Sequence, residues 1–282
     1  IKDLDMTIEE IDKLTGPVIG RPKSATFRTV DVVGLDTLVL VANGLYDNVP
    51  KDERHELFKL PDFIQTMMDN KWLGSKTGQG FYKKIKHDDG SSEIKSLDID
   101  KMDYRDGQKA KFDTLEKTKK IDEVVDRFPV LVDGDDKAGK FYRANFASLF
   151  AYVQNRIPEI TDAIYKIDDA MKAGFGWQHG PFEIWDAIGI EKGIQLMKDH
   201  GFDVADWVHH FAEQKEATFY TIKSGQTYCY NIDRKEHLKI PGQDAFIILD
   251  NIRESKEIMS NKDLVATDLG DGIMNIEFRS KM

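Results

Sequence analysis

The chain has 282 residues, of which 40% are hydrophobic, and a formal net charge of −10 at pH 7. This length predicts roughly two domains, while the negative charge and the lack of an apolar run of about 20 residues argue against a nucleic-acid partner and a membrane span. Cys229 is the only cysteine, which excludes an intramolecular disulfide and a cysteine-based zinc site, so we expect a cytoplasmic protein with a buried structural thiol and no metal ligand.

A capping box predicts the first helix, because the Thr7 hydroxyl can accept from the backbone of Glu10 while the Glu10 carboxylate reaches back to Thr7. The helix should end at Gly16-Pro17, since proline lacks a donor and restricts the residue before it. Ser24 is then expected to cap a short helix over residues 25–30.

An apolar helix is predicted next, over residues 37–45, with Asp36 as its cap. Residues 81–85 and 93–97 have the composition of short strands. The polar residues 86–92 between them have the turn chemistry of a surface hairpin or a loose insertion.

The following stretch predicts more helices. A charged helix over residues 112–128 and an apolar one over residues 141–157 precede an amphipathic stripe over residues 164–171. Pro181 should open another helix, over residues 182–188, because its missing N–H would be unpaired at that position anyway.

The character of the chain changes after Thr218. Residues 219–222 and 227–230 are aromatic and β-branched, which predicts a hairpin around a glycine turn. A second hairpin is predicted over residues 269–278, with Asp271-Gly272 as its turn.

Residues 11–36 and 167–191 match each other when one single-residue gap is allowed. Both read as helix, glycine loop, helix, glycine, helix, and the matches include loop positions as well as apolar ones. The matched pairs are Ile11-Asp12 with Ile167-Asp168, Gly20 with Gly176, Phe27 with Phe182, Asp31 with Asp186, and Gly34 with Gly189. A duplicated, mainly helical unit is the interpretation; chance similarity of two helical hairpins is the alternative.

No self-contained catalytic motif is present. Gly78-Gln79-Gly80 matches only the start of a dinucleotide fingerprint and is better interpreted as a turn into a strand. His209-His210 are adjacent, so they would point to different sides of a helix and are interpreted as surface residues. Asp31 and Asp186 occupy equivalent repeat positions and are expected to brace the following turn rather than to act as acids or bases.

Arg21, Lys23 and Ser24 are the candidate substrate-binding residues. Two cations beside a predicted helix N-terminus have the chemistry of a phosphate or carboxylate site. The alternative is a solvated loop in which Ser24 only caps its helix. His179 takes the place of Lys23 in the second copy, so both copies put a cation-capable side chain there.

These motifs together resemble the C-terminal domain of 3-hydroxyacyl-CoA dehydrogenases. The first copy carries the resemblance in residues 11–12, 20–22, 31–34 and 74–82, and the second carries it in residues 176–189. The resemblance extends over most of the first 215 residues. The final stretch is similar to the opening hairpin of a crotonase-type enoyl-CoA hydratase, which implies a fused β-oxidation protein cut at both ends.

The resemblance implies a mainly α fold with two tandem copies of a helical domain like the C-terminal domain of 6-phosphogluconate dehydrogenase, and small β-hairpins. Residues 1–84 would form the first copy and residues 85–110 a loop or hairpin insertion. Residues 111–216 would form the second copy, and residues 217–282 a β-hairpin extension into a truncated crotonase-like domain.

In an intact protein of this family, the resemblance implies oxidation of a 3-hydroxyacyl-CoA to the 3-ketoacyl-CoA with NAD. The family's His–Glu pair, a general base and its orienter, belongs to a Rossmann domain that is absent here. Its Asn-Arg pair would precede this chain, and the similar Asn155-Arg156 lies too close to Ile167-Asp168 to take the same position. We therefore assign no catalytic and no cofactor-binding residue, and expect the chain alone to be inactive.

The implied role of the chain is to close one side of the active-site cleft, to contact the acyl-CoA and to mediate subunit association. Its expected partners are the missing Rossmann and crotonase-like domains, with a homo-oligomer as a further expectation. A non-catalytic helical scaffold or acyl-CoA-binding module is the alternative. A sugar-acid or 3-hydroxyisobutyrate-type dehydrogenase also has a helical C-terminal half but would not need two copies.

Overall fold

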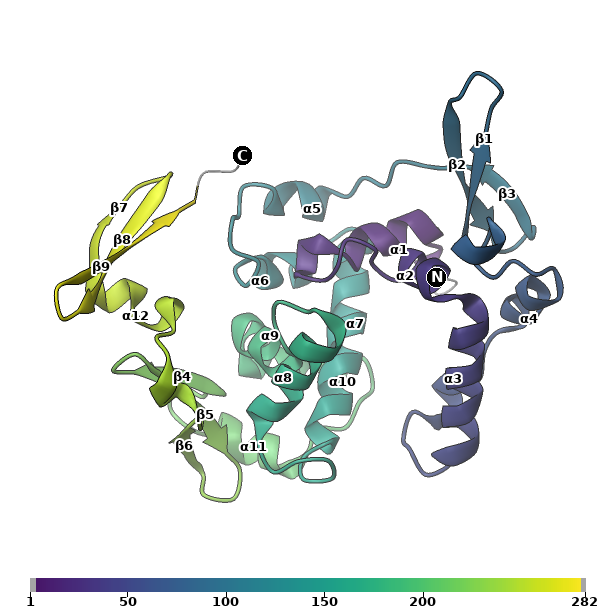
Figure 1. The fold of residues 1–282 in the computed structure, drawn as a ribbon. Helices are drawn as coiled ribbons and strands as arrows, with labels where there is room; N and C mark the ends of the chain where they lie inside the picture. The colour runs from purple at the N-terminus through teal and green to yellow at the C-terminus, as the bar shows by residue number, and fades with distance from the viewer. Residues whose placement is uncertain (1–3, 280–282) are drawn as a thin grey trace. The chain divides into compact units, whose positions relative to one another are not determined.

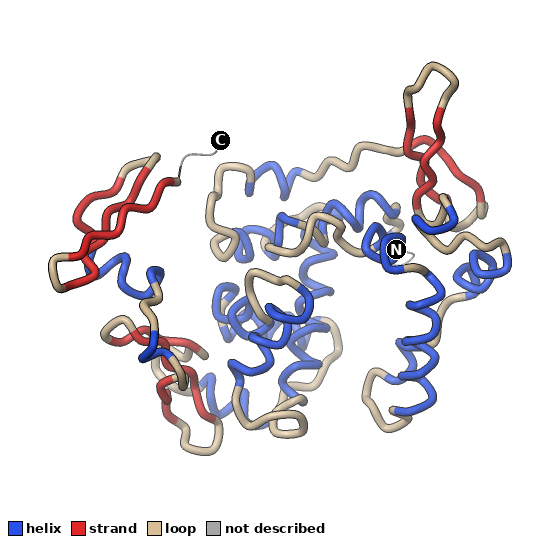
Figure 2. The backbone as a smooth tube through the Cα atoms, viewed as in Figure 1, coloured by secondary structure: helices blue, strands red, loops and turns tan. Residues whose placement is uncertain are grey.

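A computed structural model describes residues 4–279, with the exception of the side chains of residues 254 and 255. The chain forms two compact units, one of residues 1–143 with 175–178 and one of residues 144–174 with 179–282. Both combine helices with small antiparallel sheets, as Figures 1 and 2 show, so the predicted mainly α fold with small β elements is confirmed.

The first unit begins with four α-helices and continues through a small sheet into two short helices. Its elements are α1 (Ile8–Leu14), α2 (Phe27–Val33), α3 (Leu35–Asn48), α4 (Asp62–Asp69), β1 (Tyr82–Lys86), β2 (Ser92–Asp98), β3 (Asp103–Asp106), α5 (Asp113–Thr118) and α6 (Arg127–Val132). Helix α7 (Lys137–Asn155) begins in this unit and ends in the second.

The second unit continues with four helices, a sheet, a further helix and a last sheet. Its elements are α8 (Ile164–Phe175), α9 (Pro181–Ile188), α10 (Ile190–Asp199), α11 (Asp206–Ala212), β4 (Tyr220–Lys223), β5 (Gln226–Asn231), β6 (Glu236–Lys239), α12 (Leu249–Lys256), β7 (Glu257–Ser260), β8 (Leu264–Gly270) and β9 (Ile273–Phe278).

Local signals located most helix ends correctly. The capping box of α1 is present, with the Glu10 N–H donating to the Thr7 hydroxyl at 3.3 Å and the Thr7 N–H donating to the Glu10 carboxylate at 2.9 Å. Pro181 opens α9 as predicted. The apolar helix predicted over residues 141–157 is α7.

Three helix predictions were wrong. Asp36 does not cap the helix predicted over residues 37–45, because α3 begins at Leu35 with Gly34 as its N-cap, and Asp36 lies in its first turn. Ser24 does not cap a helix over residues 25–30, because α2 begins only at Phe27 and the Ser24 hydroxyl accepts from the side chain of Thr29 instead. The charged helix predicted over residues 112–128 is broken after α5. There the Arg127 guanidinium donates to the carbonyl groups of Ile121 and Asp122, which holds the chain in a turn.

Each predicted hairpin is part of a three-stranded antiparallel sheet, in the orders β1-β2-β3, β4-β5-β6 and β7-β8-β9. One strand of each sheet was missed: β3, β6 and β7. Each is only four residues long, too short to show a strand pattern of its own, and is ordered by pairing with its neighbour. The turn between β8 and β9 has positive φ at Asp271 (54°) and Gly272 (76°), as a type I′ hairpin turn requires.

The core of the first unit joins α1, α3 and α4 to the first sheet. Its buried members are Ile8, Leu35, Ile64, Met67, Phe81 and Leu97. Burial of large apolar side chains from both the helices and the sheet is the main force that holds them together.

The core of the second unit is aromatic. Phe150 on α7 stacks on Trp185 with ring centroids 4.7 Å apart, and Phe219 lies 4.7 Å from Phe211 and 5.0 Å from Phe182. Such pairs add to the stabilisation that their buried area already provides. Cys229 is buried in this unit, as predicted.

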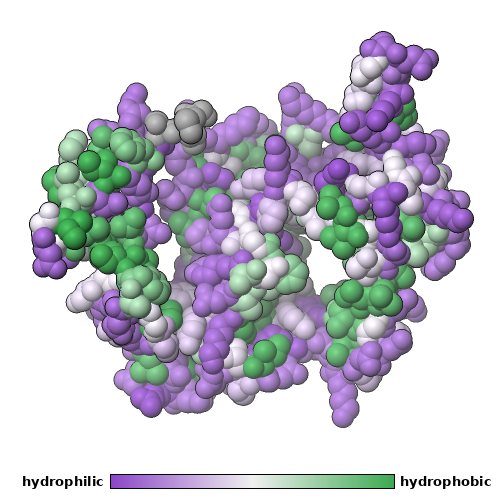
Figure 3. Space-filling view, in the orientation of Figure 1, coloured by the Kyte–Doolittle hydropathy of each residue, from purple (hydrophilic) through white to green (hydrophobic). Residues whose placement is uncertain are grey.

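The last sheet leaves many apolar side chains in contact with solvent. Figure 3 shows hydrophobic side chains gathered over it, and the exposed ones are Ile258, Met259, Ile273, Met274, Ile276 and Phe278.

Within residues 4–279, no single helix has both the length and the apolar character needed to cross a bilayer; α2 and α3 pass that test only as a pair, bent by 100°.

Candidate functional site

Asp12 organises the candidate site of the first unit. Its carboxylate accepts hydrogen bonds from the backbone N–H groups of Thr26 (3.0 Å), Phe27 (2.6 Å) and Arg28 (3.1 Å) and from the hydroxyl of Tyr82 (2.7 Å). It therefore caps α2 from a distant position in the sequence, the role that was predicted for Ser24. Burial raises the pKa of Asp12, against the effect of these four donors.

Asp31 ties the end of α2 to the first strand of the sheet. Its carboxylate accepts from the backbone N–H groups of Phe81 and Tyr82, each at 2.8 Å. The predicted structural role is confirmed, but the segment that Asp31 braces is a strand 50 residues away and not the following turn. Burial raises the pKa of Asp31.

The glycines before β1 let the backbone pass close to Asp31. A methyl group at Gly74 would overlap the Asp31 backbone, and one at Gly80 would overlap its carboxylate; Gly74 also has φ of 101°. Gly78-Gln79-Gly80 is thus a turn into a strand, as predicted.

Two aspartates of the second unit make corresponding contacts. Asp168 accepts from the backbone N–H groups of Phe182 (2.9 Å) and Glu183 (3.0 Å) and from the hydroxyl of Tyr220 (2.7 Å). Asp186 accepts from the backbone N–H groups of Phe219 (2.7 Å) and Tyr220 (2.9 Å). Asp31 and Asp186 are each followed, three residues later, by a glycine. The backbone angles of these glycines are nearly the same, φ 110° and ψ 130° at Gly34 and φ 100° and ψ 137° at Gly189.

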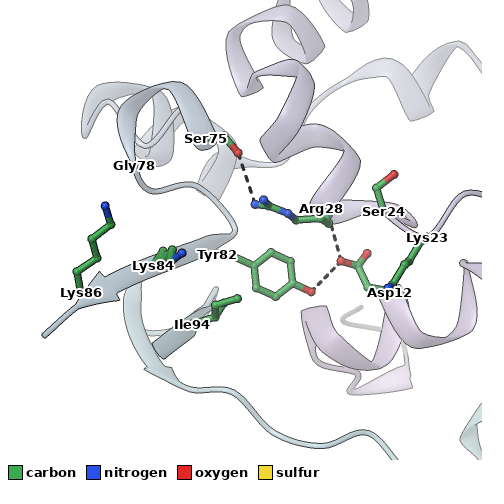
Figure 4. A pocket seen from close by; sticks show the side chains of 10 residues that line it. All are labelled: Asp12, Lys23, Ser24, Arg28, Ser75, Gly78, Tyr82, Lys84, Lys86 and Ile94. Carbon is green, nitrogen blue, oxygen red and sulfur yellow. Dashed lines mark hydrogen bonds between the residues drawn. The ribbon is translucent and has the colours of Figure 1, made fainter. Parts of the chain in front are cut away.

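A cavity of about 830 Å³ opens beside Asp12 and Tyr82 in the first unit. Figure 4 shows the side chains around it, which come from α1, from the loop before α2, from α2, from the turn before β1 and from the sheet. The lining residues are Asp12, Lys23, Ser24, Arg28, Ser75, Gly78, Tyr82, Lys84, Lys86 and Ile94. Four of these side chains are cationic and one is a carboxylate.

Of the three predicted substrate-binding residues, Lys23 and Ser24 line this cavity and Arg21 does not. The Arg21 guanidinium lies over the ring of Trp177, 3.7 Å from its centroid. Burial lowers the pKa of Arg21 to about 10, and its Nε has no hydrogen-bond partner among residues 4–279.

Arg28, Lys84 and Lys86 were missed by the sequence analysis. The signal was present, because side chains alternate between the two faces of a strand and residues 82, 84 and 86 therefore share one face. The sequence alone could not show that this face of β1 lies opposite α2. That arrangement depends on the contacts of Asp31 with the start of β1.

The other singled-out residues lie outside this cavity. His209 and His210 are exposed on α11, in agreement with their interpretation as surface residues. His179 lies 3.9 Å from the Glu183 carboxylate. Arg156, which follows Asn155 at the end of α7, lies over the ring of Tyr152 at 4.3 Å.

The described residues do not fit NAD. A dinucleotide site of the Rossmann type needs parallel strands and a glycine-rich turn into a helix. In residues 4–279 all three sheets are antiparallel, and Gly80 is packed against the Asp31 carboxylate, where a pyrophosphate would need open backbone. No group of three or more potential metal-ligating side chains occurs in the same range.

Comparison with known proteins identifies the family. The model of the 3-hydroxyacyl-CoA dehydrogenase C-terminal domain matches residues 2–84 and 148–226, more than half of the chain. The chain belongs to this family. The matched ranges contain Asp12, Asp31, Asp168 and Asp186 together with the start of β1 and the whole of β4.

Three relatives illustrate the breadth of the match. A "Probable 3-hydroxyacyl-CoA dehydrogenase" of Bacillus subtilis (strain 168) is 39% identical over 275 residues, 97% of this chain and 34% of that protein. A protein of the same name from Deinococcus radiodurans is 46% identical over 81 residues, 29% of this chain and 22% of that protein. A Rickettsia prowazekii protein, named as a trifunctional enzyme of a fatty acid oxidation complex, is 26% identical over 66% of this chain and 24% of its own length. The chain thus spans about a third or less of each relative.

Proposed function

We propose that this chain is the substrate-side and oligomerisation part of an NAD-dependent 3-hydroxyacyl-CoA dehydrogenase of fatty-acid oxidation. In the intact protein, the C3 hydroxyl of a 3-hydroxyacyl-CoA loses a hydride to NAD and a proton to a base, which gives the 3-ketoacyl-CoA. The observation that carries this proposal is the family match over parts of both units. NAD and the base belong, in this proposal, to parts of the intact protein other than this chain.

The proposal includes two tandem copies of the helical domain. The matching contacts of Asp12 with Tyr82 and of Asp168 with Tyr220 support it, because the same chain geometry recurs at both places. In this division residues 1–84 and 111–216 are the copies, with residues 85–110 between them; Tyr220 lies four residues beyond the second range and completes its contact with Asp168. Residues 217–282 lead toward a crotonase-like domain, and the exposed apolar side chains of the last sheet support a further domain that covers them.

Lys23 and Ser24 are the proposed contacts for the anionic part of the acyl-CoA. They line the cavity beside Tyr82, where cations outnumber carboxylates. Arg21 lies against Trp177, outside the cavity, and its part in substrate binding remains a prediction.

The test is an assay of NADH formation by the intact protein and by this chain alone. With a 3-hydroxyacyl-CoA as substrate, we expect NADH from the intact protein and none from the chain alone. Calorimetric titration of the chain with the same acyl-CoA should show binding. An intact protein that forms no NADH would reject the dehydrogenase. If that intact protein still bound the acyl-CoA, an acyl-CoA-binding module would be favoured instead.

A further inference from the structure

We propose that the cavity beside Tyr82 is a binding site for the phosphate groups of a nucleotide-type ligand, held by Lys23, Arg28, Lys84 and Lys86. The phosphates of the nucleotide end of CoA and those of a free nucleotide share this chemistry. Only the assignment to CoA rests on the function proposed above; the phosphate site itself rests on the cavity.

The charge of the cavity is the first argument. The whole chain is negative, with 50 acidic and 40 basic residues, yet the cavity has four cations and one carboxylate. That carboxylate belongs to Asp12, which already accepts from three backbone N–H groups and the Tyr82 hydroxyl. The cavity is therefore a local positive site on an anionic protein, which attracts negatively charged ligands.

The second argument is that the lysines of the cavity have no acidic partner among the described residues. Within residues 4–279, Lys23, Lys84 and Lys86 form no ion pair. Other lysines of the first unit do pair, as Lys76 does with Asp36 and Lys95 with Asp106 at 3.1 Å. Three unpaired ammonium groups around one cavity repel each other, and an anionic ligand would relieve that repulsion.

The geometry brings these cations together from three elements. Alternation along β1 puts Tyr82, Lys84 and Lys86 on the cavity side, whereas Lys83 lies over the ring of Tyr104 at 5.2 Å. Arg28 enters from α2, with its Nη1 3.5 Å from the hydroxyl of Ser75. Lys23 comes from the loop on the far side of Asp12, as Figure 4 shows.

The second unit provides an internal comparison. Counted from the matched aspartates and tyrosines, the positions of Arg28, Lys84 and Lys86 are taken there by Glu183, Ile222 and Ser224. The aspartate–tyrosine contact forms in both units, so it does not need the cations. Their presence in the first unit alone is explained by a ligand and not by folding.

The size of the cavity indicates the ligand class. A volume of about 830 Å³ is in the range of small-molecule sites, about 300–1,000 Å³, and exceeds what one inorganic phosphate needs. Several cations distributed over such a space suit a ligand with more than one phosphate. The ring of Tyr82 and the side chain of Ile94 add apolar surface for the rest of the molecule.

Calorimetric titration at low salt tests the proposal with four probes: CoA, adenosine 3′,5′-bisphosphate, ATP and pantetheine. We expect at least one phosphate-bearing probe to bind, and pantetheine, which has no phosphate, not to bind. The variant Lys84→Ala/Lys86→Ala should weaken that binding about tenfold or more, equivalent to about 1.4 kcal/mol. The control Lys140→Ala/Lys198→Ala removes the same charge at helix surfaces outside the cavity and should change the affinity less than about twofold.

Absence of binding by all three phosphate-bearing probes would overturn the proposal, as would equal affinity in the wild type and the cavity variant. Binding of ATP without CoA would support the phosphate site and count against its assignment to CoA. Failure of the phosphate site would thus be seen in the titrations. Failure of the proposed function would be seen separately, in the NADH assay of the intact protein. Circular dichroism of each variant confirms that the fold is retained.

Discussion

The hydroxyl of Tyr82 donates to the carboxylate of Asp12 at 2.7 Å, although the two residues are 70 positions apart in the sequence. The same carboxylate caps α2, so one side chain fixes both the start of a helix and the position of β1. Tyr220 and Asp168 make the same contact at 2.7 Å in the second unit. This pair is therefore the point at which helices and sheet are joined in each unit.

Removal of the Tyr82 hydroxyl should destabilise the first unit. In Tyr82→Phe, Asp12 keeps its three backbone donors but loses the fourth, and a hydrogen bond to a charged group contributes about 1.5–3 kcal/mol. Because Tyr82 is only partly buried, we expect the lower end of this range. The free energy of unfolding, measured by urea denaturation, should fall by about 1.5 kcal/mol.

The matched control is Tyr46→Phe. The ring of Tyr46 stacks on His55, and the substitution keeps that ring, so its effect should stay within about 0.5 kcal/mol. Equal effects of the two substitutions would show that the Tyr82–Asp12 contact does not stabilise the fold.

Two glycines of the first unit should respond in opposite directions to alanine. Gly74 has φ of 101° and its added methyl group would overlap the Asp31 backbone, so Gly74→Ala should cost more than about 2 kcal/mol. Gly44 lies inside α3 with no atom within 4 Å of the added methyl group, so Gly44→Ala should stabilise the fold by about 0.5–1 kcal/mol. Thermal unfolding of both variants checks the pair, and a stable Gly74→Ala would refute the close approach to Asp31.

What the sequence predicted correctly is mostly local. The capping box at Thr7, the start of α9 at Pro181 and the turn at Asp271-Gly272 each depend on residues within one turn of chain, and each is present. The resemblance to the 3-hydroxyacyl-CoA dehydrogenase C-terminal domain, which motifs such as residues 74–82 carry, is confirmed by the family match.

What it missed depends on contacts between distant segments. Asp12 caps a helix that begins 15 residues later, and this displaced the role predicted for Ser24. The cavity combines Lys23 with Lys84, which only the docking of β1 on Asp31 brings to one place. No periodicity within a single element encodes such a contact.

Even a conservative replacement of Arg105 should weaken its ion pair with Glu9. Nη1 and Nη2 of Arg105 lie 2.8 and 2.9 Å from the two carboxylate oxygens of Glu9. A lysine cannot form this two-pronged contact, so Arg105→Lys should lower the free energy of unfolding by about 0.5–1.5 kcal/mol at pH 7. The exposed Arg234→Lys serves as the control, with an expected change within about 0.5 kcal/mol.

Acid should remove the difference between the wild type and Arg105→Lys. Burial acts to raise the pKa of Glu9, but hydrogen bonds from Arg105 and from the backbone of Gln108 prevail and lower it from 4.5 to about 2. The contribution of this carboxylate is therefore present above pH 4.5 and is lost as the pH falls toward 2. An advantage of the wild type that persists unchanged at pH 2 would contradict the ionic origin of the contact.

The buried aspartates of the second unit predict the opposite pH dependence. Burial, reinforced by the charge of Glu183, raises the pKa of Asp168 from 3.8 to about 7 against the effect of its three donors. Burial likewise raises the pKa of Asp186 to about 6. The folded state then keeps protons that the unfolded chain has released, so this contribution to stability is complete below pH 3.8 and is lost as the pH rises to about 7.

Asp168→Asn tests this directly, because asparagine has a similar shape and does not titrate. Between pH 4 and pH 7 the free energy of unfolding of the wild type should fall relative to the variant, at up to about 1.4 kcal/mol per pH unit. The wild type should thus exceed the variant most at pH 4 and least at pH 7. Asp233→Asn, at an exposed turn, should run parallel to the wild type over the same range. A constant difference between Asp168→Asn and the wild type would mean that Asp168 is already ionised in the folded protein at pH 4, because its three hydrogen-bond donors outweigh the cost of burying the charge.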